Sequence, residues 1–167
     1  MNVLFHTATA IGLTVLLTDT EKINKISKSL NIVVLSSILF LLGIFFHGVL
    51  DYIPHCYPIN SKIDVVLSFI IIIATVIIFK NPFKILIGFS FLGSIIPDVI
   101  DLLPSIFNKY FELTSFTDIK IFPWHWKEYS GSVYSENCNV SILNQIFLIF
   151  AILIICFYRK KDLKNFI

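Results

Sequence analysis

Histidine and aspartate side chains recur at short spacings in a chain that is otherwise apolar. His47 and Asp51 are four residues apart at the end of one apolar segment, and Asp98 and Asp101 are three residues apart at the end of another. In a helix, both spacings place the two side chains on one face. Imidazole nitrogen and carboxylate oxygen are ligands that suit zinc, or manganese and iron where more oxygen is present. The pattern therefore predicts a divalent metal site between the two pairs.

Two more histidines are expected near this site. His6 lies at the start of the first apolar segment, and His55 directly follows Pro54. A proline ends or kinks a helix, so the chain is expected to turn after Asp51 and bring His55 back over the site as an alternative ligand. Pro97 similarly predicts a helix break immediately before the Asp98 carboxylate. The candidate metal ligands are His6, His47, Asp51, His55, Asp98 and Asp101.

The fourth histidine, His125, stands between two tryptophans in the sequence PWHW. It is either a proton donor on a loop that covers the site or part of an interfacial aromatic belt, and the sequence leaves both interpretations open. Asp101 is either a further ligand or the general base. The candidate catalytic residues are thus Asp101 and His125. Two other acidic residues on the same side, Asp64 and Glu112, are interpreted as solvated charges.

The composition indicates an integral membrane protein. Hydrophobic residues make up 56% of the 167 positions and charged residues 14%, with a mean hydropathy of +0.85. Soluble domains contain about 45–50% apolar residues. The net charge of +2 is small and the lysines are scattered, so a nucleic-acid partner is not expected. The lipid bilayer is the expected partner.

Five apolar segments approach the length of about 20 residues that a membrane-spanning helix needs. They cover approximately residues 3–18, 31–53, 63–79, 83–103 and 141–158. The first could be a signal peptide, but it lacks a basic start and is followed by DTEKINKISKSL, so we interpret it as a helix. The predicted fold is one all-α membrane domain, residues 1–167, with about five spanning helices and a long outer loop at 104–140.

The basic residues predict the orientation. With five spans, nine of the thirteen lie on one side, in the first and third connections and the C-terminal tail, and the other four are Lys62, Lys109, Lys120 and Lys127. The positive-inside rule then places the N-terminus outside and the C-terminus in the cytoplasm of a bacterial or archaeal cell. All four histidines fall on the outer side. The inner halves of the helices carry only small hydroxyl groups such as Ser36, which favours a site over an ion pathway.

Two of the three cysteines also lie on the outer side. Cys56 and Cys138 flank segments that are expected to approach each other, and Cys156 lies in the last span. An extracytoplasmic location permits oxidation, so a disulfide between the outer two is one prediction. The alternative is that Cys56, beside His55, is a soft metal ligand.

Three stretches, FHTATAIG, HGVLDYIPH and LGSIIPDVID, resemble the membrane-bound metal-dependent hydrolase superfamily, the inner-membrane hydrolases that include a LexA-regulated branch. The resemblance covers roughly residues 1–105. It implies metal ligation at the positions that match its motifs, which are His6, His47, Asp51, Asp98 and Asp101. Leu102 stands where many members have histidine after Pro-Asp-x-Asp, and a His-Arg-Gly-x-x-His-Ser motif is missing.

The resemblance implies metal-assisted hydrolysis. The predicted topology puts the site at the outer membrane interface, and the ligand set makes zinc the first candidate ion, with manganese or iron as others. Such a site suits a lipid or another amphiphilic ester or phosphoester. The alternative function is a nonenzymatic metal-binding or transport-associated membrane protein that uses the same residues.

Overall fold

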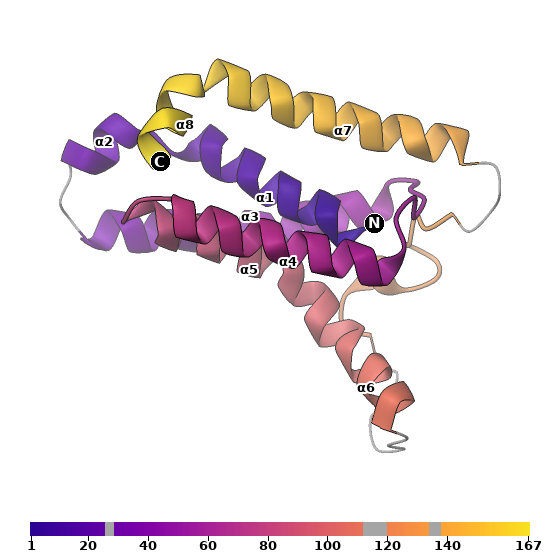
Figure 1. The fold of residues 1–167 in the computed structure, drawn as a ribbon. Helices are drawn as coiled ribbons and strands as arrows, with labels where there is room; N and C mark the ends of the chain where they lie inside the picture. The colour runs from indigo at the N-terminus through magenta and orange to yellow at the C-terminus, as the bar shows by residue number, and fades with distance from the viewer. Residues whose placement is uncertain (26–28, 112–119, 134–137) are drawn as a thin grey trace.

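The computed structural model describes residues 1–25, 29–111, 120–133 and 138–167, and this part of the chain is helical apart from short connections and one isolated β-bridge (Figure 1). The helices are α1 (Val3–Leu17), α2 (Thr20–Lys25), α3 (Ser29–Tyr52), α4 (Ser61–Ile78), α5 (Phe83–Asp101), α6 (Leu103–Phe111), the 3₁₀ turn η1 (Pro123–His125), α7 (Asn139–Tyr158) and α8 (Lys160–Phe166).

Four helices are long and apolar enough to cross a membrane, and they coincide with four of the five predicted segments. They cover Asn31–Tyr52, Ser61–Ile78, Phe83–Asp101 and Ser141–Tyr158. At 1.5 Å per residue, such helices extend about 27–33 Å, close to the thickness of a hydrocarbon core. The all-helical class predicted from the sequence is confirmed for the described residues.

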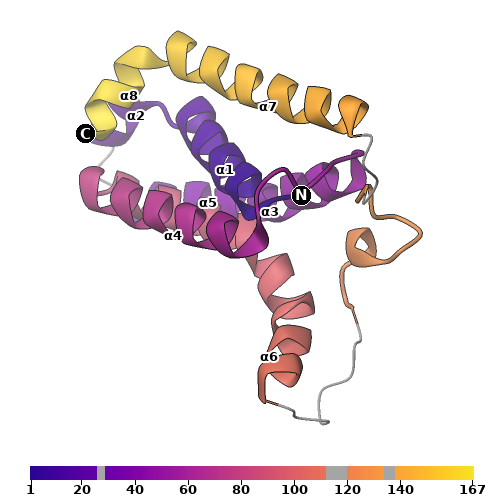
Figure 2. The same ribbon diagram turned by 45° about the vertical axis from the view of Figure 1, so that its right-hand side comes forward.

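The first apolar segment forms the centre of the bundle. Helix α1 packs against α3, α4, α5 and α7, and Figures 1 and 2 show it running between α7 and the layer of α3, α4 and α5. Nine of its 15 residues are buried, among them His6. Its 15 residues fall short of the usual spanning length. A fifth span thus stays a prediction, while the role of α1 as a core helix is a finding.

Two glycines allow the backbones of α3 and α5 to touch. A Cβ atom on Gly93 would lie 2.1 Å from the carbonyl oxygen of Phe40, and one on Gly43 would lie 2.8 Å from the backbone nitrogen of Ser94. Small residues at such crossings are a common feature of membrane helix pairs. The crossing aligns the last turns of α3 with those of α5, so His47 faces the turn that carries Asp98.

The two prolines act differently on their helices. Helix α3 ends at Tyr52, two residues before Pro54, as predicted. Helix α5, however, runs without interruption through Pro97 to Asp101, so the predicted break before Asp98 is wrong. Proline removes one main-chain donor from the helix. In the turn before Pro97, the Ser94 carbonyl oxygen accepts a hydrogen bond from a ring nitrogen of His47, 2.7 Å away, so a side chain of α3 binds the helix at this point.

Asp64 is a helix cap and not the solvated charge that we predicted. Its side chain is buried, and its two carboxylate oxygens accept the main-chain N–H groups of Val3 and Leu4 at 2.8 and 2.9 Å. These donors have no partner within the first turn of α1. A carboxylate at a helix N-terminus also interacts favourably with the helix dipole. Asp64 therefore fixes the start of α1 to α4. Glu112 lies outside the described residues.

Residues 120–133, which we call the strap, cross the end of the bundle and are bonded to the chain after α3. The Gly131 N–H donates to the Asp51 carbonyl, the His55 N–H donates to the Gly131 carbonyl, and the Val133 N–H donates to the His55 carbonyl, at 2.7–2.9 Å. A Cβ on Gly131 would lie 2.3 Å from the Ile53 carbonyl oxygen, so only glycine permits this approach. The predicted disulfide between Cys56 and Cys138 is confirmed and links this region to the start of α7.

Candidate metal centre

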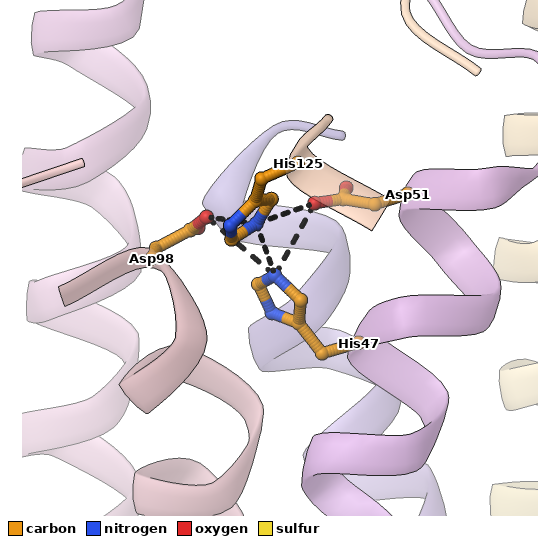
Figure 3. A group of neighbouring side chains, drawn as sticks. All are labelled: His47, Asp51, Asp98 and His125. Carbon is orange, nitrogen blue, oxygen red and sulfur yellow. Dashed lines mark hydrogen bonds and ion pairs between the residues drawn. The ribbon is translucent and has the colours of Figure 1, made fainter. Parts of the chain in front are cut away.

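Four side chains from three segments converge at the end of the bundle (Figure 3). His47 and Asp51 come from α3, Asp98 from α5, and His125 from η1 in the strap. One potential ligand atom from each lies within 4.8 Å of the others, so the group could hold a metal ion. Three of the four are buried, and Asp98 is partly exposed. The pair His47 and Asp51 on α3 therefore faces Asp98 on α5, as the helical spacings predicted.

The distances within this group suit a small divalent ion. His47 Nε2 lies 3.2 Å from Asp51 Oδ2 and 3.5 Å from Asp98 Oδ1. His125 Nε2 lies 3.3 and 3.2 Å from the same two oxygens, and the two Nε2 atoms are 3.3 Å apart. A tetrahedral ion with bonds of about 2.0–2.1 Å separates its ligand atoms by about 3.3–3.4 Å. Five of the six separations therefore match the edges of such a tetrahedron, and the sixth, between the Asp51 and Asp98 oxygens, is within 4.8 Å.

The Nδ1 atom of each imidazole already has a hydrogen-bond partner outside the four-atom group. His47 Nδ1 lies 2.7 Å from the Ser94 carbonyl oxygen, and His125 Nδ1 lies 2.8 Å from Asp101 Oδ2. Both partners accept only, so each Nδ1 must carry a hydrogen, and in a neutral ring Nε2 then presents a lone pair. Two lone pairs and two carboxylate oxygens thus meet at one point. Positive charge, either a metal ion or protons on the two rings, would stabilise this arrangement.

Asp101 lies behind His125 and does not face the four-atom group. Its carboxylate accepts the main-chain N–H groups of Ile121 and Phe122 at 2.8 and 2.9 Å, in addition to the His125 ring. A carboxylate that holds the second nitrogen of a ligating histidine fixes the tautomer and the orientation of the ring. Asp101 thus contacts the strap and the far side of the His125 ring, whereas the sequence suggested a ligand or a base at this position.

The charge around His125 favours a cation at this position. Burial opposes protonation of its ring, but the hydrogen bonds to Asp51, Asp98 and Asp101 outweigh burial and raise the pKa of His125 to about 10. The strap therefore delivers an imidazole into a strongly negative environment. A divalent ion would satisfy the same carboxylates, and it would compete with the proton for the Nε2 lone pair.

His6 lies beside the group. Its ring stacks on that of His47 with the centroids 4.0 Å apart, and its Nε2 lies 3.2 Å from Asp51 Oδ1, the oxygen that the Met1 amino group also contacts. His6 is buried, yet neither ring nitrogen makes a hydrogen bond to a described residue. It is thus adjacent to the four-residue group without belonging to it.

His55 is not brought to the site. Its Nδ1 donates to the Ile53 carbonyl at 2.8 Å, and its Nε2 lies 3.2 Å from both the Tyr57 hydroxyl and Ser132 Oγ. The chain turns toward the strap after α3 and does not fold back over Asp51. The alternative role of His55 as a ligand therefore has no support in the geometry. Cys56 is bonded to Cys138 and is not a ligand either.

Sequence reasoning placed His125 near the site and named it as a possible substitute for a missing ligand, but assigned it to the catalytic residues rather than to the metal ligands. The available signal was its outward position in the loop after the Asp98 and Asp101 pair. The neighbouring Trp124 packs against α3 beside the site, because a Cβ on Gly48 would lie only 2.6 Å from its ring.

Comparisons with family models, curated proteins and solved structures find no match for this chain.

Proposed function

We propose that this chain is a membrane-embedded, metal-dependent hydrolase that acts on a lipid or another amphiphilic ester or phosphoester at the outer membrane interface. The observation that carries the proposal is the convergence of four acceptor atoms, from His47, Asp51, Asp98 and His125, at separations that suit one ion. Two imidazoles with two carboxylates favour zinc, and manganese or iron are further candidates.

A bound divalent ion supplies an acidified water molecule and polarises the scissile group. The residues of the chain have distinct tasks around it. His47 and His125 offer Nε2, because the Ser94 carbonyl and Asp101 hold the other nitrogen of each ring. Asp98, the most exposed of the four, is the ligand that a substrate would reach most readily. His6, whose Nε2 lies 3.2 Å from Asp51 Oδ1, is placed to orient that carboxylate.

The competing function is a nonenzymatic metal-binding protein, and one observation favours it. Four protein ligands can fill a tetrahedral coordination sphere, whereas catalytic zinc sites commonly keep one position for water. Catalysis at this site would require five-coordination or release of one carboxylate, for which Asp98 has the most room.

The two functions are separated by measuring metal and turnover on the same preparation. Purified protein would be assayed for zinc, manganese and iron and then tested on a panel of phosphoesters and acyl lipids. The hydrolase proposal expects bound metal and a turnover that a chelator abolishes. Stoichiometric metal without turnover on the whole panel would favour the binding function.

The proposed orientation places the site, the strap and the N-terminus outside and the C-terminus in the cytoplasm. Single cysteines at Lys22 and Lys127, both exposed and near opposite ends of the bundle, test it. The background carries Cys156→Ala, since the other two cysteines are joined in the disulfide. A membrane-impermeant thiol reagent should label Lys127→Cys in intact cells and Lys22→Cys only after lysis. The reverse pattern would overturn the orientation.

A further inference from the structure

Helix α6 leaves the bundle immediately after the metal-site region. It begins at Leu103, two residues after Asp101, and Figures 1 and 2 show it extending away from the end of α5 at a steep angle to the other long helices. It spans nine residues, or about 14 Å, and is therefore too short to cross a membrane. Because α6 extends away from the bundle, it needs another surface to pack against.

Over residues 103–108, where side-chain exposure is described, the pattern is the reverse of that expected for a helix in water. The apolar residues Leu103, Ile106 and Phe107 are exposed by 40, 48 and 45%, whereas the polar residues Ser105 and Asn108 are partly buried. Apolar residues at spacings of three and four form one face of a helix. A helix whose apolar side chains are exposed and whose polar side chains are partly buried suits an apolar environment rather than water.

This apolar face continues the lipid-facing surface of a candidate spanning helix. On α5, directly before α6, Val99 and Ile100 are exposed, and Leu102 is exposed in the connection between the two helices. No change from apolar to polar surface separates the helices. The strap adds exposed Trp126 and Tyr129, residue types that concentrate at membrane–water boundaries.

We infer that α6 is an interfacial helix that lies in the head-group layer of the outer leaflet, with Leu103, Ile106 and Phe107 in the acyl boundary. The inference rests on the membrane placement in the proposed function and identifies the substrate class of that site. Asp98, the most exposed residue of the metal-binding group, lies on α5 five residues before α6 begins, so an interfacial α6 would keep it close to the level of the lipid head groups. A lipid reaches the site by lateral movement within the leaflet.

The depth of α6 is measured with an environment-sensitive fluorophore on single cysteines. Phe107→Cys and, as the matched control on the neighbouring position, Asn108→Cys are made with Cys156→Ala and the disulfide intact, in nanodiscs of phosphatidylethanolamine and phosphatidylglycerol. Lys22→Cys, whose native side chain is 77% exposed, provides the aqueous reference. A shallow nitroxide lipid should quench the label at 107 at least threefold more than the reference label at 22. Aqueous iodide should quench the label at 107 less than the reference label. The label at 108 should give intermediate values with both quenchers.

Equal iodide quenching at positions 107 and 22 would overturn the inference, whatever the activity of the protein. A buried label at 107 with no lipid turnover would retain the interfacial helix and count against the hydrolase. If turnover is found, Ile106→Ser with Phe107→Ser should lower the rate on vesicles at least fivefold while leaving a short-chain soluble ester of the same class unchanged. An equal loss on both substrates would contradict the role of α6 in lipid access.

Discussion

The Nδ1 atom of His125 lies 2.8 Å from Asp101 Oδ2, on the side of the ring opposite to the metal-binding group. The same carboxylate accepts the main-chain N–H groups of Ile121 and Phe122. One buried side chain on α5 thus determines both where the strap begins to cross the bundle and which way its histidine points. A potential ligand that comes from a loop is in this way tied to a helix of the bundle.

Asp101→Asn tests this positioning role. The amide keeps an acceptor oxygen but loses the charge and one acceptor, so the His125 ring should be held less well in its tautomer. We expect metal affinity to fall about 10–100-fold, as is typical when such a partner is removed. Competition with a chelating dye measures it. Glu128→Gln, an exposed acidic residue of the same strap, is the control and should leave the affinity unchanged. Equal affinity in both variants would show that Asp101 does not position the ligand.

Asp64→Asn should destabilise the protein without removing its metal. The carboxylate caps two N–H groups of α1, and loss of a helix cap costs about 0.5–2 kcal/mol. Thermal unfolding in detergent should show a lower midpoint, and the metal content per folded chain should match that of the wild type. Asp19→Asn is the matched control. The native Asp19 side chain is exposed and accepts the Lys22 N–H, so its replacement should lower the midpoint less. A midpoint that does not change would argue against the cap.

Gly93→Ala and Gly88→Ala should differ although both lie in α5. The added methyl group at 93 meets the Phe40 carbonyl, whereas at 88 no atom beyond the neighbouring backbone of α5 lies within 4 Å. Helix α5 must move away from α3 in the first variant, which also separates His47 from Asp98. We expect a clear loss of thermal stability and metal for Gly93→Ala. Gly88→Ala should be neutral or more stable by up to about 1 kcal/mol. Similar stabilities for the two variants would contradict the close helix crossing.

Helical spacing predicted much of the site. The separation of His47 from Asp51, and of Asp98 from Asp101, sufficed to place each pair on one face, because helix geometry is local. Four of the long apolar segments were also correct, since length and apolarity alone identify candidate spans.

Contacts between distant segments could not be predicted in the same way. Whether Asp64 is solvated depends on the N-terminus of α1, some 60 residues away in the chain, and nothing in its own neighbourhood records that contact. His55 is paired by the strap, and His125 is directed inward by Asp101. Pro97 suggested a break, yet α5 continues through it while packed closely against α3. Tertiary packing decided each of these positions.

Burial of His55 predicts a dependence of stability on pH. Burial, followed by the amino-terminal charge, lowers the pKa of His55 below its usual value, so the unfolded chain binds a proton that the folded chain rejects. The free energy of unfolding should therefore fall as the pH drops below about 6.5. We expect the thermal midpoint of metal-free protein to fall more between pH 7.5 and 5.5 in the wild type than in His55→Gln. The same fall in both proteins would show that His55 is not the group responsible.

The central claim is that His47, Asp51, Asp98 and His125 bind one divalent ion. The most direct measurement is the metal content of purified protein, combined with X-ray absorption at the edge of the bound metal, for the wild type, His47→Ala and Asp98→Asn. We predict one ion per chain with nitrogen and oxygen ligands at about 2.0–2.1 Å, and its loss in both variants while membrane insertion is unchanged. A wild-type protein that stays metal-free after exposure to zinc, manganese and iron, or variants that keep the same ion in the same coordination, would contradict the account.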